Sequence, residues 1–228
     1  MYSRSGKCRA TVSLTAFAAL LVFAASFGSA PVVAQPADID LDVIAPLPND
    51  APIGYFIADG AAQSGGRSGD EELCRWALDD WVRHADGKID VVPAAETEAR
   101  VRVYFTSPAR RTQYGEMQPI LVDGRRGAEV YVRANTDELS PEIAAAARAD
   151  PLFRETVVYL TCLHEIGHAL GMEHTDRFAD VMYYFGFGGD IIDFFNIYRL
   201  RLESRADIQR QSGLSPGDIA RLRALWPD

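Results

Sequence analysis

The sequence has few cysteines, few histidines and a deficit of positive charge. Its 228 residues include three cysteines and four histidines, and 23 Lys and Arg stand against 32 Asp and Glu, for a formal net charge of -9. Three cysteines are too few for a disulfide-rich scaffold, and no basic stripe or nucleic-acid motif is visible, so we expect no nucleic-acid partner. The composition, 48% hydrophobic and 24% charged, is typical of one globular domain.

Long apolar runs are also lacking, with one exception near the start of the chain. Three cations precede an apolar run from about Val12 to Phe27, and small residues follow it, which is typical of a secretory signal peptide. We expect 1–34 to be removed after Ala34 and the protein to be secreted or periplasmic. An uncleaved membrane anchor is the alternative, because the run approaches the minimum length of a span. Beyond this segment we expect no contact with a membrane.

Removal of the signal peptide leaves two cysteines, Cys74 and Cys162, in an oxidising compartment. Both fall on the apolar stripes of expected helices. A disulfide between these helices and a pair of buried free thiols both fit the sequence, because the sequence does not give the distance between the two Cα atoms.

The periodicity of the remaining chain predicts an α+β domain with a mixed sheet. Residues 35–52 are rich in Pro, Asp and Ala, and we expect an extended leader that lies over the surface or is disordered. Strands are expected at 53–58, 88–92, 101–105, 119–122 and 128–133, and helices at 70–85, 141–149, 151–170 and 191–198.

Several local features set the ends of these elements. Ser68 or Asp70 is expected to cap the first helix, and Asp150-Pro151 to begin the long helix. Asp190 is expected to cap the helix that follows it. Pro119 places its strand at an edge of the sheet, because proline cannot donate a ladder hydrogen bond, and a turn at Asp123-Gly124 joins this strand to the next.

Three of the four histidines lie in the segment HEIGHALGMEH. On a helix, His164 and His168 are one turn apart and project from one face, where both imidazoles can bind one metal ion. Glu165 lies beside them and can accept a proton from a water activated by the metal. Gly171 tolerates a left-handed backbone, so the chain can turn and bring His174 back as a third ligand. Three protein ligands and an open fourth position are typical of a catalytic zinc site.

The segment HEIGHALGMEH resembles the zinc-binding signature of the metzincin clan of metalloproteases. Met182 follows His174 at a spacing similar to the methionine turn of the matrixin branch, and 214–226 resembles the matrixin C-terminal helix. The resemblance implies a metzincin-like zinc protease domain over 53–228, with an upper subdomain at 53–171 and a lower one at 172–228. Its mixed twisted sheet would have an antiparallel edge strand and would pack against an N-terminal helix and the active-site helix, followed by the Met-turn and the C-terminal helix.

The resemblance also implies the activity, an exported endopeptidase in which zinc-activated water cleaves the peptide bond and Glu165 is the general base. One catalytic Zn²⁺ would be bound by His164, His168 and His174. A polypeptide substrate would bind extended along the edge strand near 118–122, and we expect a monomer. A metal-retaining peptide-binding module without turnover, and a zinc amidase acting on a non-protein substrate such as cell-wall peptide, are the alternatives.

Two features depart from the matrixin pattern. Tyr184 stands where matrixins have a proline and where astacin-like and serralysin-like metzincins have a tyrosine. Its phenol can donate to the developing oxyanion or approach the metal as a fifth ligand, and the other interpretation is a packed aromatic ring. The long stretch 183–213 is expected to form a lid or a wall of the specificity pocket, or to pack beneath the site.

The remaining candidate ligands offer little for a second metal site. Asp123, Asp137 and Glu138 lie near expected turns without forming a recognisable loop, so Ca²⁺ is open but unsupported. His84 is the fourth histidine, and at the end of its helix we expect it to be solvated or to cap the helix. One zinc ion is therefore predicted.

Overall fold

The computed structural model describes residues 41, 44–60, 66–106 and 114–227. The expected signal peptide at 1–34 lies outside this part of the chain, as does most of the leader before 44. None of the described helices is long and apolar enough to span a membrane.

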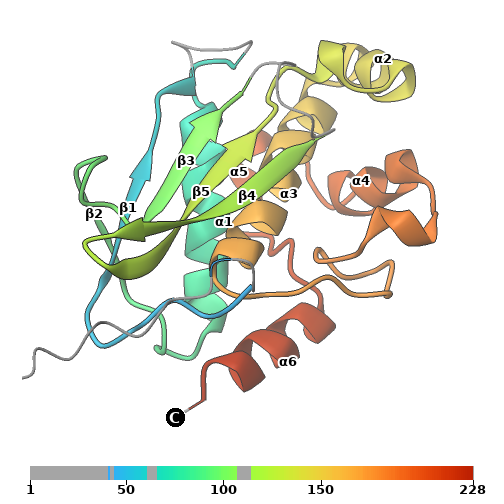
Figure 1. Ribbon diagram of the computed structural model, residues 1–228. Helices are drawn as coiled ribbons and strands as arrows, with labels where there is room; N and C mark the ends of the chain where they lie inside the picture. The colour runs from blue at the N-terminus through green and yellow to red at the C-terminus, as the bar shows by residue number, and fades with distance from the viewer. Residues whose placement is uncertain (1–40, 42–43, 61–65, 107–113, 228) are drawn as a thin grey trace, which may run out of the picture. The chain divides into compact units, whose positions relative to one another are not determined.

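The described residues form one five-stranded sheet with the strand order β2-β1-β3-β5-β4 (Figure 1). The strands are β1 (Ile53–Ile57), β2 (Val91–Pro93), β3 (Val101–Phe105), β4 (Gly115–Val122) and β5 (Arg125–Val132). Neighbouring strands are parallel except β4, which is antiparallel to β5. The predicted α+β class, the mixed sheet and the antiparallel edge strand are confirmed.

The hairpin of β4 and β5 is longer than the sequence predicts. β4 begins at Gly115, and Pro119 is the partner of Ala128 in the hairpin. The Ala128 N–H donates to the Arg100 carbonyl on the β3 side, so this pair exchanges no hydrogen bond between β4 and β5. The missing N–H of Pro119 therefore costs the sheet no hydrogen bond. Asp123 and Gly124 both have positive φ, 50° and 74°, as a tight two-residue hairpin turn requires. Proline therefore marks the edge position of this strand and not its first residue.

The second strand and the cap of the first helix also differ from the prediction. The second strand covers Val91–Pro93 and not 88–92, because the Lys88 N–H donates to the Ala85 carbonyl and belongs to the turn after the first helix. The first helix, α1 (Asp70–His84), has Gly69 in a left-handed conformation at its N-cap, and no side chain caps it. Asp70 is not the cap because its carboxylate is bonded elsewhere, as described below.

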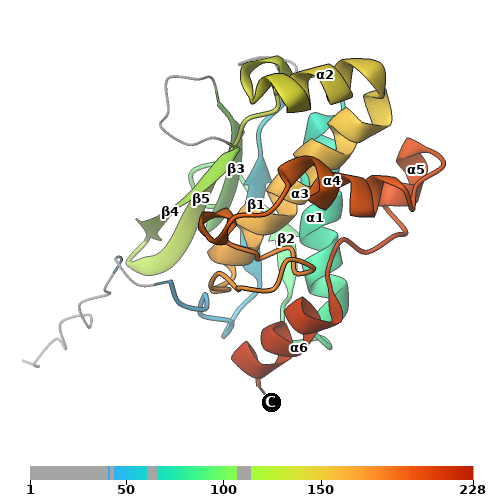
Figure 2. The same ribbon diagram turned by 90° about the vertical axis from the view of Figure 1, so that its right-hand side faces the viewer.

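α1 and α3 (Pro151–Ala169) lie side by side on one face of the sheet (Figures 1 and 2). The predicted start of α3 is confirmed, since the Asp150 carboxylate accepts from the Leu152 N–H and Pro151 is the first helical residue. The core between the helices and the sheet is apolar, with fully buried Trp81, Val130 and Val157. The other helices are α2 (Pro141–Ala149), α4 (Ile191–Arg199), α5 (Arg205–Ile208) and α6 (Pro216–Leu225), and single 3₁₀ turns occur at η2 (Thr136–Glu138) and η3 (Phe185–Phe187).

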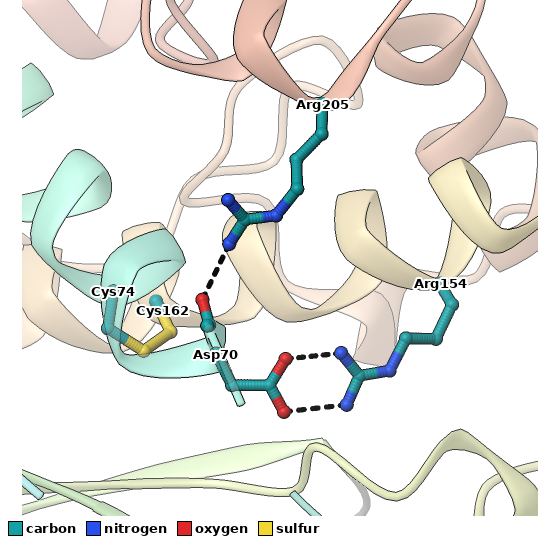
Figure 3. The surroundings of a disulfide bond; sticks show 6 residues. Asp70, Cys74, Arg154, Cys162 and Arg205 are labelled. Carbon is teal, nitrogen blue, oxygen red and sulfur yellow. Dashed lines mark hydrogen bonds and ion pairs between the residues drawn. A yellow bond between two sulfur atoms is a disulfide. The ribbon is translucent and has the colours of Figure 1, made fainter. Parts of the chain in front are cut away.

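A disulfide joins the two long helices, which answers the question that the sequence left open. Cys74 on α1 and Cys162 on α3 are bonded, with their Cα atoms 5.2 Å apart (Figure 3). Both cysteines are fully buried. The bond fixes α3 two residues before His164.

A buried ion pair joins the same helices near their N-terminal ends (Figure 3). Both oxygens of Asp70 accept from the guanidinium of Arg154, and the two side chains are almost completely buried. Arg154 also donates to the Ala134 carbonyl at 2.9 Å, next to the end of β5. Arg205 reaches the same region and donates to the Gly69 carbonyl at 2.6 Å.

The described part of the leader packs on the domain. Leu47 is 2% exposed and belongs to the hydrophobic core. Arg100 donates to the Pro48 carbonyl at 2.8 Å, and Asn49 donates to the Lys88 carbonyl at 3.3 Å. The described part of the leader is thus an extended segment that lies on the domain, and burial of Leu47 and the two carbonyl contacts hold it there.

The Asp70–Arg154 pair provides the first test. Arg154→Met should lower the free energy of unfolding by about 3–5 kcal/mol, because it leaves a buried carboxylate without its partner. The double variant Asp70→Leu/Arg154→Met should lower the free energy of unfolding by less than the single variant does, because no buried charge remains. Urea unfolding followed by circular dichroism measures both; a double variant less stable than the single one would contradict the interpretation.

Candidate metal centre and cleft

The end of α3 turns sharply at Gly171, and this turn brings the third histidine back towards the helix. Gly171 has a φ of 94°, which favours glycine. A Cβ atom at this position would also lie 2.6 Å from the backbone nitrogen of Pro46 in the leader. Conformation and space therefore both require glycine here, as the sequence predicted from conformation alone.

The structure brings His164, His168 and His174 together. The Nε2 atom of His174 lies 3.3 Å from Nε2 of His164 and 3.1 Å from Nε2 of His168. One nitrogen from each ring lies within 4.8 Å of the others, so the three can hold one metal ion. His168 is buried, His164 is half-buried and His174 is exposed. One side of the group therefore faces solvent.

Backbone carbonyls orient two of the rings. Nδ1 of His164 donates to the Val181 carbonyl, and Nδ1 of His168 donates to the Met172 carbonyl, each at 2.7 Å. Because a carbonyl only accepts hydrogen bonds, the proton of each ring is on Nδ1. The lone pair of each Nε2 therefore faces the space between the three histidines, where a metal ion can bind. Burial lowers the pKa of His164 to about 4 and that of His168 to about 3, so both rings are neutral at pH 7, as metal ligands must be.

Glu165 is buried beside this group and lines the same cleft. Burial, and next the negative charge of Glu116, raise its pKa to about 8 in the absence of a metal ion. A cation bound by the histidines would lower this pKa. Gly115 of β4 lies against the side chain, since a Cβ atom there would be 2.6 Å from Cγ of Glu165. The edge strand and the glutamate are thus in direct proximity.

Met182 lies against α3 at the level of the histidines. Its side chain is fully buried, and its sulfur would be 2.5 Å from a Cβ atom added to Gly167, the residue before His168. The Met182 carbonyl accepts from the Thr175 N–H at 2.8 Å, and the Tyr184 N–H donates to the Thr175 carbonyl at 3.0 Å. These bonds hold the residues after His174 against 181–184, which we call the methionine segment.

Asp218 binds the backbone of the methionine segment, a role that was not predicted from the sequence. Its carboxylate is completely buried and accepts from the N–H groups of Val181 at 2.8 Å, Met182 at 3.4 Å and Ser215 at 2.9 Å. Ser215 and Asp218 form the capping box of α6. The Ser-x-x-Asp spacing was visible in the sequence, but it indicates a helix start and not a contact with a distant loop.

A cleft of about 490 Å³ opens beside the histidines. Its polar floor consists of the three histidines and Glu165. Its other sides are largely apolar or aromatic and are lined by Tyr114, Gly115, Leu160, Thr161, Val181, Tyr183, Tyr184, Phe185, Gly186, Ile191, Phe194 and Phe195. A polypeptide side chain beside the histidines would therefore meet an apolar wall.

The stretch 183–213 supplies much of this wall and also packs into the core. Tyr184 is 48% exposed, and its ring centroid is 5.0 Å from that of His174. Phe195 lines the cleft, yet it is nearly buried, as is Tyr198 on the same helix. The predicted helix after Asp190 is confirmed, with the Asp190 carboxylate accepting from two N–H groups. The wall and packing interpretations thus both describe parts of this stretch.

Other predicted site residues lie elsewhere. Within the described part of the chain, Asp123, Asp137 and Glu138 do not enter a group of three metal-ligating side chains, and Asp137 pairs with Arg148. Nδ1 of His84 lies 2.8 Å from the Asp80 carbonyl in the last turn of α1. Among the residues of β4, Gly115 lines the cleft but 118–122 do not.

A scan against models of known protein families finds no match for this chain, and a search of curated proteins finds none either. The geometry of the site is therefore the evidence on function.

Asp218 gives a prediction for metal affinity. Asp218→Asn puts an amide nitrogen against backbone N–H donors, which should displace Val181 and with it the acceptor of His164. Affinity for Zn²⁺, measured by calorimetric titration, should fall by about 10- to 100-fold. Asp207 has the same capping-box position in exposed α5, so Asp207→Asn is the matched control and should leave affinity unchanged. Equal affinities in both variants would contradict a role of Asp218 at the metal centre.

Proposed function

We propose that the protein is an exported, zinc-dependent endopeptidase of the metzincin clan, similar to the matrixin branch. The observation that supports this most is the convergence of three Nε2 atoms beside a buried glutamate at the floor of an open cleft. The motif HEIGHALGMEH and the place of Met182 add the resemblance. The signal-like N-terminal sequence and the disulfide between Cys74 and Cys162 are in keeping with export.

The donor set fits zinc. Three neutral imidazole nitrogens are typical zinc ligands, and three protein ligands leave a fourth position for a water molecule or a substrate. When bound, Zn²⁺ would polarise the scissile carbonyl and lower the pKa of a water molecule towards about 7. His164, His168 and His174 would hold the ion, and the solvent-facing side of His174 would leave it accessible from the cleft.

Glu165 would move the proton. Its carboxylate would take a proton from the attacking water and return it to the nitrogen of the departing amine. Peptide-bond hydrolysis needs both transfers, and one carboxyl beside the metal ligands can do both. The buried position of Glu165 keeps its side chain at the cleft floor, against Gly115 and Thr161.

The outer edge of β4, with which no other strand of the described residues pairs, would bind the substrate backbone. The Ala128 N–H points to β3, so the backbone groups of its partner Pro119 point away from β5. Every second residue of an antiparallel strand faces the same way, so the backbone groups of Gly115 and Met117 also point outward. An extended peptide can pair with these outward groups as an added strand. The half of β4 next to Glu165 suits this better than 118–122, because Pro119 has no N–H to donate.

The decisive experiment compares the purified protein with its Glu165→Gln variant. Zn²⁺ should bind to both at near one equivalent, while cleavage of an unfolded protein should fall by about 10²-fold or more in the variant, because the general base is lost. A chelator should abolish cleavage by the original protein, and added Zn²⁺ should restore it. Glu173→Gln, an exposed change in the same segment, is the matched control and should cleave normally.

The other outcomes of this experiment separate the alternatives. Zn²⁺ binding without cleavage of any protein or peptide would favour a peptide-binding module. Cleavage of cell-wall peptide but not of protein would favour a zinc amidase. In either case the endopeptidase proposal would be wrong.

Tyr184 is proposed to donate to the oxyanion that forms on the scissile carbonyl. Its half-exposed ring lies beside that of His174 at the cleft, where a phenol can reach a bound carbonyl. Tyr184→Phe should lower kcat by about 10²-fold or more with little change in zinc content, because one oxyanion donor is lost. Tyr183→Phe removes the adjacent hydroxyl, which donates to the Gly188 carbonyl, and should have a much smaller effect. An unchanged kcat in Tyr184→Phe would leave the ring a packing role only.

A further inference from the structure

A second cavity lies directly behind the wall of the metal cleft. It has a volume of about 240 Å³ and lies between α4 and the residues that lead into α6. Its lining is largely apolar and includes Phe178, Ile197, Tyr198 and Leu214. The metal cleft is the larger of the two, at about 490 Å³.

The two cavities share three lining residues, Leu160, Val181 and Phe194. Each of these residues therefore borders both the metal cleft and the second cavity. We call these three residues the partition. All three side chains are apolar, so no side-chain hydrogen bond has to be broken to open the partition. Together they form the back wall of the cleft.

Two of the three partition residues are fixed by their surroundings. Leu160 is 4% exposed on α3, one helical turn before His164. Val181 is 3% exposed; its N–H donates to Asp218, and its carbonyl accepts from His164. A change at either residue would disturb the metal centre itself.

Phe194 differs from these two. It is half-buried on the short helix α4, which follows Gly188 and Gly189, both with positive φ. Its neighbours are aromatic rings in edge contact, Phe185 with a centroid distance of 5.1 Å and Phe178 with 5.9 Å. Within the partition, Phe194 can therefore be replaced without disturbing a residue on α3 or a residue hydrogen-bonded to a histidine.

We propose that Phe194 sets the depth of the specificity pocket, by closing the metal cleft against the second cavity. This inference rests on the proposed endopeptidase activity. The substrate class that follows is a polypeptide with an apolar side chain next to the scissile bond that fits the cleft without entering the second cavity. Removal of the Phe194 ring joins the two cavities and admits longer apolar side chains.

The test uses the Zn²⁺-loaded protein and fluorogenic peptides that differ at the two residues flanking the scissile bond. Leucine is compared with biphenylalanine at each position. In Phe194→Ala the ratio of kcat/KM for biphenylalanine over leucine at one of the two positions should rise about tenfold or more, because a larger apolar side chain then becomes buried. Phe194→Leu, a milder change, should raise the ratio less.

Ile197→Ala is the matched control. Ile197 lines the second cavity and not the cleft, so its truncation enlarges that cavity without opening the partition, and the ratio should stay unchanged. Thermal unfolding verifies that each variant is folded, and Phe194→Leu keeps the test available if the alanine variant does not fold.

The outcomes distinguish the inference from the function on which it rests. An unchanged ratio in folded Phe194 variants that still cleave leucine peptides would overturn the inference alone. An equal rise in Ile197→Ala would overturn it as well, because the partition would not be responsible. If the original protein binds Zn²⁺ but cleaves no peptide, the proposed function fails and the inference fails with it.

Discussion

The fixed position of α3 relative to α1 is the constraint on which the metal centre depends. Near the start of α3, Arg154 is buried, and a buried guanidinium is tolerated only when its charge is matched and its N–H groups are hydrogen-bonded. Asp70 supplies the opposite charge, and the Ala134 carbonyl accepts a further hydrogen bond. Near its end, Cys162 is covalently bonded to α1, and the Trp81 indole donates to the Leu163 carbonyl. His164 and His168 thus project from a helix that is bonded to its neighbours both before and near these residues.

The second half of the chain completes the site through hydrogen bonds that buried carboxylates accept. Asp218 holds the backbone of Val181 and Met182, and Asp180 accepts from the hydroxyl of Ser215 at 2.5 Å. The Val181 carbonyl in turn orients His164. The start of α6 is thus connected to His164, a candidate metal ligand on α3, through one loop residue, Val181. Net stabilisation by such buried carboxylates depends on all their partners being present.

Features set by a few neighbouring residues could be predicted from the sequence, and those set by distant partners could not. The start of α3 at Asp150-Pro151, the turn at Asp123-Gly124 and the facing of His164 and His168 follow from local backbone rules. Asp70 shows the limit, because its position fits a helix cap while its actual partner is Arg154, far along the chain. The disulfide and the role of Asp218 depend in the same way on distances that no local pattern contains.

The free edge of β4 has a consequence for self-association. An exposed strand edge beside an apolar cleft is a template for pairing with another copy of the same chain, which leads to aggregation. Pro119 interrupts the row of outward donors in the middle of the strand, and charged side chains lie in the hairpin turn and directly after it, as with Asp123 and Arg125. The outward donors before this proline are those of Gly115 and Met117. The same proline that would limit the pairing of an added peptide strand thus also limits the pairing of this edge with another copy of the chain.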